Sequence, residues 1–66
     1  MIIFDNLWET MRKKGVSTYA LREKHSIDTR TIRRLKANEN VTTDTLNTIC
    51  GILDCKLQDI AEYVKD

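Results

Sequence analysis

Apolar side chains recur at helical spacing along most of this chain, and this repeat constrains the fold more than any other feature. Positions i, i+3, i+4 and i+7 are apolar in several segments, and residues so spaced share one face of a helix. The sets are Phe4, Leu7, Trp8 and Met11, then Leu46, Ile49, Cys50 and Leu53, then Leu57, Ile60, Ala61 and Val64. Proline is absent and glycine occurs only at Gly15 and Gly51. The pattern therefore predicts an all-α chain with tight connections.

Start and stop signals place the first two helices. Gly15 follows three basic residues and suits the position just past a helix end. Ser17 or Thr18 can then accept a hydrogen bond from a free backbone amide and cap the next helix. We expect this second helix to run from about Thr18 to His25.

The third helix is predicted to begin after Asp28, a strong capping residue, and to end near Ala37. Its apolar positions Ile32 and Leu35 should face the core. Asn38 follows, and asparagine tolerates the left-handed conformation that often ends a helix. The fourth helix has two candidate capping residues, Thr42 and Thr43. The last apolar set, which begins at Leu57, predicts a fifth helix. Residues 1–66 are therefore expected to form a single compact domain of five helices.

Size and composition argue against an enzyme or a metalloprotein. A chain of 66 residues leaves little room for a substrate pocket, and it contains no recognisable nucleophile–base set or phosphate-binding loop. Cys50, Cys55 and His25 are too few to hold a metal ion. We interpret both cysteines as small buried apolar residues. No catalytic residue, metal, cofactor or small-molecule ligand is expected.

Targeting signals are also missing. No apolar run approaches the roughly 18–20 residues that span a bilayer. The first five residues, from Met1 to Asp5, lack the basic start and small-residue cleavage site of a signal peptide. We therefore expect a cytoplasmic protein without membrane contact.

Charge is distributed unevenly. The formal net charge is only +1. Between Arg12 and Lys36, however, nine basic residues stand against two acidic ones, so this segment carries +7 and the rest of the chain −6. The asymmetry indicates one face for a polyanion and another face turned away from it. A solvated surface would show the same charges, so charge alone does not decide.

Residues 17–38 have the length of a helix-turn-helix unit, with two short helices joined by a tight turn. If Ile32 and Leu35 face the core, the outer face of the third helix carries Thr29, Arg30, Arg33 and Arg34. Arginine can donate two bonds to a guanine in the major groove, and threonine can bond a base edge or a phosphate. Helix N-termini nearby also bind phosphate.

The chain resembles the lambda-repressor/Cro-like (XRE-type) helix-turn-helix domains, and in particular small stand-alone bacterial and phage regulators. The residues that carry the resemblance are 17–21, 27–35, 42–47, 49–55 and 57–63. The resemblance implies five helices, with the third in the major groove of DNA and the second across the backbone.

Carried over by position, the resemblance places Thr29, Arg30 and Arg34 where bases are read. We add Arg33 to this set because it shares the outer face. Contacts to phosphate are expected from Ser17, Thr18, Lys36, Asn38, Asn40 and Thr43.

The sequence departs from the family pattern at three positions. Members often have glutamine at Thr18 and glycine at Ser26. They often have alanine at Arg22, packed between the second and third helices. Arg22 must therefore point its head outward, or the angle between the helices must differ.

These features predict a sequence-specific transcriptional regulator, a repressor, that binds double-stranded DNA as a homodimer. The alternative is a helix-turn-helix interaction module, an antitoxin or adaptor, that has lost DNA binding. An adaptor would carry apolar or acidic residues on the outer face of the third helix, where this chain has arginines. We expect the dimer contact at the two chain ends, through Tyr63, Val64, Ile2 and Ile3.

Overall fold

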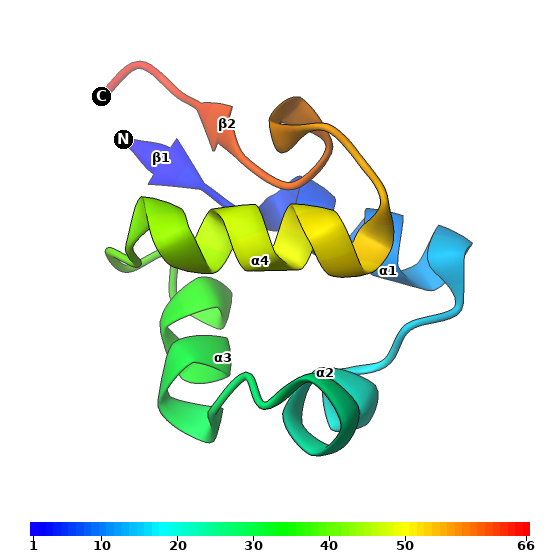
Figure 1. Ribbon diagram of the computed structural model, residues 1–66. Helices are drawn as coiled ribbons and strands as arrows, with labels where there is room; N and C mark the ends of the chain where they lie inside the picture. The colour runs from blue at the N-terminus through cyan, green and yellow to red at the C-terminus, as the bar shows by residue number, and fades with distance from the viewer.

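The computed structural model describes all 66 residues and contains four α-helices, a single 3-10 turn and a two-stranded sheet. In chain order these are β1 (Ile2–Ile3), α1 (Asp5–Lys14), α2 (Thr18–His25), α3 (Thr29–Lys36), α4 (Thr43–Leu53), η1 (Leu57–Asp59) and β2 (Glu62–Tyr63). Figure 1 shows α4 between the sheet on one side and the α2–α3 pair on the other. The longest helix, α4, has 11 residues, so none of the helices reaches across a bilayer.

Side-chain caps start three of the helices. The bonds run from Ala20 N to Ser17 Oγ (3.1 Å), from Thr31 N to Asp28 Oδ1 (2.7 Å) and from Thr45 N to Thr42 Oγ1 (3.1 Å). Each bond satisfies an amide that has no partner inside its helix, and such a cap contributes about 1 kcal/mol. The predicted caps of α2, α3 and α4 are therefore confirmed, with Ser17 and Thr42 as the capping residues of the candidate pairs.

Left-handed residues end the helices. Gly15 after α1 and Asn38 after α3 have φ values of 70° and 56°, as their residue types predict. Ser26 and Asp54 adopt the same conformation at the ends of α2 and α4, with φ values of 61° and 52°. The short connections follow from these tight helix ends.

Ten buried apolar side chains form one core cluster, and every helix contributes to it. They are Phe4, Leu7, Met11, Leu21, Ile27, Ile32, Leu35, Ile49, Leu53 and Ile60. Trp8, Cys50 and Cys55 are partly buried against the cluster. Both cysteines are free thiols, and desolvation raises the pKa of Cys55 above its ordinary value. This packing agrees with their interpretation as small apolar residues.

Although the chain is mostly helical and compact as expected, the predicted fifth helix is wrong. Its segment begins with the 3-10 turn η1, which Lys56 N stabilises by donating to Asp59 Oδ2 at 3.0 Å. The chain then extends as β2 and pairs antiparallel with β1, Ile2 opposite Tyr63 and Ile3 opposite Glu62. The Val64 amide continues the pairing to the Met1 carbonyl at 2.8 Å.

Two physical reasons favour the strand. A helix of two or three turns is marginal unless it buries an apolar face. Of the expected stripe, however, only Ile60 is buried, and Leu57 is 54% exposed. Isoleucine and tyrosine also favour extended backbone, and Ile2 and Ile3 supply a partner strand. Tyr63, which we expect at the dimer contact, is 68% exposed and does not belong to the core.

One long-range hydrogen bond ties the end of α3 to the start of α1. The Phe4 amide donates to Asn38 Oδ1 at 2.7 Å across 34 positions in the sequence. Phe4 precedes the first residue of α1 and has no side-chain cap of its own. The Asn38 side chain therefore holds two elements together, besides the left-handed turn that its backbone makes.

We expect Asn38→Ala to lower the free energy of unfolding. The change leaves a partly buried amide without its acceptor, at about 1–3 kcal/mol, and adds the cost of a left-handed alanine, about 1 kcal/mol. Asn38→Gly keeps the backbone conformation and removes only the bond. Urea denaturation followed by circular dichroism measures both effects. Asn40→Ala is the matched control and should shift stability by less than about 0.5 kcal/mol. A wild-type urea midpoint for Asn38→Gly would contradict this role.

Candidate nucleic-acid interface

Helices α2 and α3 meet through a short turn built on Ser26 and Ile27. Ser26 has the left-handed conformation that glycine adopts most easily. The Ile27 amide donates to the Leu21 carbonyl at 3.0 Å, and the Ile27 side chain is buried in the core. The turn is therefore fixed by backbone and core together, although serine stands where relatives often have glycine.

Burial of Ile32 and Leu35 turns the opposite side of α3 to the solvent. Thr29, Arg30, Arg33 and Arg34 are all exposed on that side. None of the three arginines takes part in an ion pair, since the structure contains only the pairs Met1–Asp66, Arg12–Glu9 and Arg22–Glu23. The helix thus presents free guanidinium groups.

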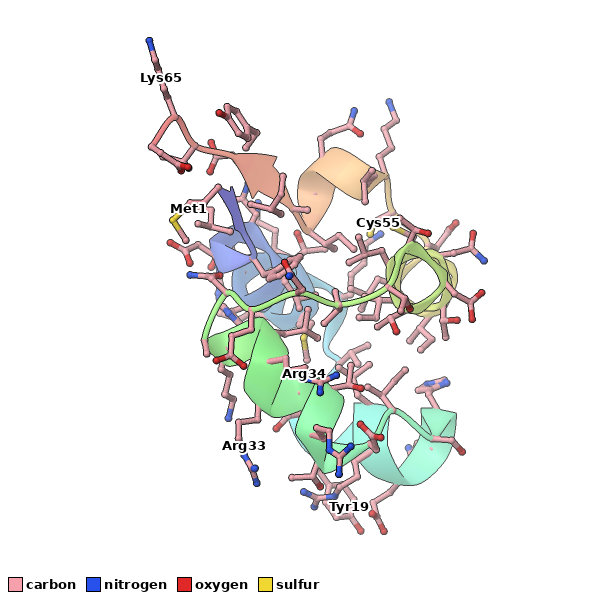
Figure 2. The ribbon with its side chains drawn as sticks, turned by 90° about the vertical axis from the view of Figure 1, so that its left-hand side faces the viewer. Met1, Tyr19, Arg33, Arg34, Cys55 and Lys65 are labelled. Atoms are coloured by element: carbon pink, nitrogen blue, oxygen red, sulfur yellow. The ribbon has the colours of Figure 1, made fainter.

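These side chains form two rows along α3. Arg30 and Arg34 are four positions apart and form one row, because such positions are neighbours on a helix surface. Thr29 and Arg33 form the other row, which Lys36 continues. Figure 2 shows Arg33 and Arg34 leaving the helix in different directions. The four candidate base-reading residues therefore do not point at one spot.

Asp28 places a negative charge beside the first row. Its hydrogen bonds from the Thr31 side chain and the Thr31 backbone amide lower the pKa of the carboxyl, and the charges of Arg30 and Arg34 lower it further. Because the folded-state pKa is depressed, this cap is fully formed at neutral pH. It is lost as the pH falls through that lowered pKa.

Some of the residues expected to contact phosphate already use their side-chain oxygens in hydrogen bonds within the protein. Ser17 Oγ is engaged in capping α2, and Asn38 Oδ1 accepts from Phe4. The structure brings Asn38, Asn40 and Thr43 to one hollow beside the start of α4. Lys36 is exposed near the end of α3. The candidates thus lie at both ends of α3.

A polar groove separates α2 from α3 on the side of the second row. Its lining residues are Thr18, Arg22, Thr29, Ile32, Arg33 and Lys36. Arg22 is exposed, with its guanidinium carbon 5.7 Å from the ring centre of Tyr19 and its Nε 3.3 Å from Glu23 Oε2. The head of Arg22 therefore points outward, the first of the two alternatives that its sequence position left open.

Tyr19 was not singled out from the sequence as a surface residue, yet it is 61% exposed. The signal was present, because Tyr19 and Arg22 are three positions apart in a helix and can stack. Figure 2 shows Tyr19 at the end of the molecule remote from Met1 and Lys65.

The four expected dimer residues lie together at the paired chain ends. Ile2 faces Tyr63 across the sheet. Ile2 and Tyr63 are exposed, Val64 is 39% exposed and Ile3 is half-buried. The structure contains no group of three histidine, cysteine or acidic side chains placed to hold a metal ion.

Comparison with known proteins identifies the fold. A family model for the Cro/C1-type helix-turn-helix DNA-binding domain matches residues 6–66. A crystal structure of the transcriptional regulator VanUg superposes with a TM-score of 0.88 at 29% sequence identity, covering 98% of this chain and 87% of that one. No curated protein sequence matches the chain significantly.

The family match confirms the resemblance inferred from residues 17–63 and extends over nearly the whole chain. The helix-turn-helix consists of α2, the turn at Ser26 and α3. This protein belongs to the Cro/C1-type helix-turn-helix DNA-binding domains.

Proposed function

We propose that this protein is a sequence-specific regulator of transcription that binds double-stranded DNA with α3 in the major groove. One observation carries the proposal: α3 exposes Arg30, Arg33 and Arg34, and no acidic side chain pairs with any of them. Unpaired surface cations on a helix of this size fit a polyanionic groove. The matching crystal structure is itself described as a transcriptional regulator.

Base reading is assigned to the start of α3 and to its first row. Thr29 and Arg30 stand in the first turn, where recognition helices meet base edges. Arg34 follows Arg30 one turn later on the same side. Arginine prefers the O6 and N7 atoms of guanine. We therefore expect guanines in the bound sequence.

Repression is the regulatory action that we propose, because a protein that occupies a DNA site excludes competitors from it. We propose that the protein acts in the cytoplasm. The adaptor alternative predicts no duplex binding, so a DNA-binding measurement separates the two.

A homodimer is proposed for the working form. One recognition helix reads only a few base pairs, and two half-sites about one helical turn apart multiply that information. Exposed apolar side chains adjoin the paired chain ends, where Ile2, Tyr63 and Val64 would meet a second copy. Leu57 and Met1 extend this apolar surface.

Binding to duplex DNA should weaken steeply as salt rises. Each phosphate that a basic side chain neutralises releases counterions and adds about −0.9 to the slope of log affinity against log salt. Fluorescence anisotropy with a random duplex pool at several salt concentrations measures the slope. Selection of bound sequences from the same pool then defines the site. No detectable binding to any duplex at low salt would favour the adaptor.

Arg30→Ala should relax base preference and weaken binding to the selected site by about 1–3 kcal/mol, because a bidentate contact to a base is lost. Lys36→Ala, at the far end of α3, should weaken selected and random duplexes to the same extent. Competition titrations with both duplexes give the two affinities of each variant. Equal losses on both duplexes for Arg30→Ala would instead assign Arg30 to phosphate.

Two chains should bind each selected site, and that site should have two-fold symmetry. Analytical ultracentrifugation with and without the selected duplex gives the stoichiometry, and the selected sequences give the symmetry. Tyr63→Lys should reduce dimer formation while leaving the fold intact, since Tyr63 is exposed in the single chain. One chain on an asymmetric site would overturn the dimer.

A further inference from the structure

All the charged residues that line the groove between α2 and α3 are cations. Arg22 comes from α2, Arg33 and Lys36 come from α3, and no acidic residue contributes to its lining. The hollow encloses about 200 Å³, enough for a small oxyanion group with bound water. Three like charges at one hollow repel each other unless an anion lies among them. The groove is therefore suited to an anionic group.

Arg22 is held in place at this groove. Its guanidinium stacks against Tyr19 within the range of a cation–π contact. Only Nε is engaged with Glu23, at 3.3 Å, and no hydrogen bond within the protein uses the two terminal nitrogens. A guanidinium positioned in this way keeps both terminal amino groups free for a phosphate oxygen pair.

The groove lies on the flank of α3. Arg30 and Arg34 form the row assigned to bases, whereas Thr29, Arg33 and Lys36 form the row that borders α2. The major groove is about 12 Å wide, so a helix within it has a sugar–phosphate strand along each flank. When Arg30 and Arg34 face the bases, Arg33 and Lys36, which follow Thr29 along the row toward α2, face one of these strands.

We propose that this groove binds a phosphate of the DNA backbone, with Arg22 and Arg33 donating to its oxygens and Lys36 adding charge at the outer end. The inference rests on the proposed DNA binding and deepens it. It assigns Arg33 to the backbone instead of the bases. It also gives a function to Arg22, the position at which this chain departs from the alanine common in the family.

The test compares Arg22→Ala with Lys24→Ala in the full chain. Lys24 is an exposed cation on the same helix and is not among the lining residues of the groove. We expect Arg22→Ala to reduce the magnitude of the salt slope by about 0.9 and to weaken selected and random duplexes by the same factor. Lys24→Ala should keep the wild-type slope.

Two further variants sharpen the result. Arg22→Lys retains the charge, so it should restore the slope while losing the paired donors. Arg33→Ala should behave like Arg22→Ala and unlike Arg30→Ala, which changes base preference. Circular dichroism checks that each variant is folded, as expected for exposed side chains.

The outcomes are distinguishable. A wild-type protein that binds no duplex would overturn both the proposed function and this site. A wild-type protein with a steep slope that Arg22→Ala leaves unchanged would overturn the groove alone. The groove would also be overturned if Arg22→Ala and Lys24→Ala reduced the salt slope by the same amount, because general surface charge would then explain the effect. Altered base preference in Arg33→Ala would return Arg33 to the bases.

Discussion

The burial of Ile32 and Leu35 determines which side of α3 faces the solvent, and the arrangement of the proposed DNA-binding residues depends on it. Each of these side chains contributes about 1.5–3 kcal/mol when buried. A domain of this size is stable by only about 5–15 kcal/mol, and ten residues make up its core. Rolling α3 about its axis would expose one of the two and bury an arginine. The burial of Ile32 and Leu35 thus fixes the side of α3 from which the guanidinium groups project.

Polar side chains in this protein divide into those that build the fold and those that remain free. Ser17, Asp28 and Asn38 use their oxygens on backbone amides. The arginines of α3 are not used in this way. A small domain has few residues, so the side chains that make structural hydrogen bonds and those that remain free stand at neighbouring positions. Asn38 is expected to contact phosphate, but its side-chain oxygen already accepts a hydrogen bond from the Phe4 amide.

Helix starts and stops were predictable because they depend on residues close in sequence. The caps span three positions, and the left-handed turns at Gly15 and Asn38 depend on single residue types. The chain ends were not predictable in the same way, since the strand at Tyr63 exists only because Ile2 lies beside it. For the interface, the exposed face of α3 followed from the spacing of its apolar residues. The contact of Arg22 with Tyr19 could have been predicted from their i, i+3 spacing, whereas the groove that Arg22 lines required the packed structure.

The pairing of β1 with β2 has a consequence for how the molecule fluctuates. It closes a loop of nearly the whole chain with two residues in each strand, and such long-range contacts form late in folding. The helix-turn-helix rests on short-range bonds and on the core. The sheet should therefore open and close many times while α2 and α3 stay intact, and amide hydrogens near Tyr63 should exchange with solvent well before those of α3.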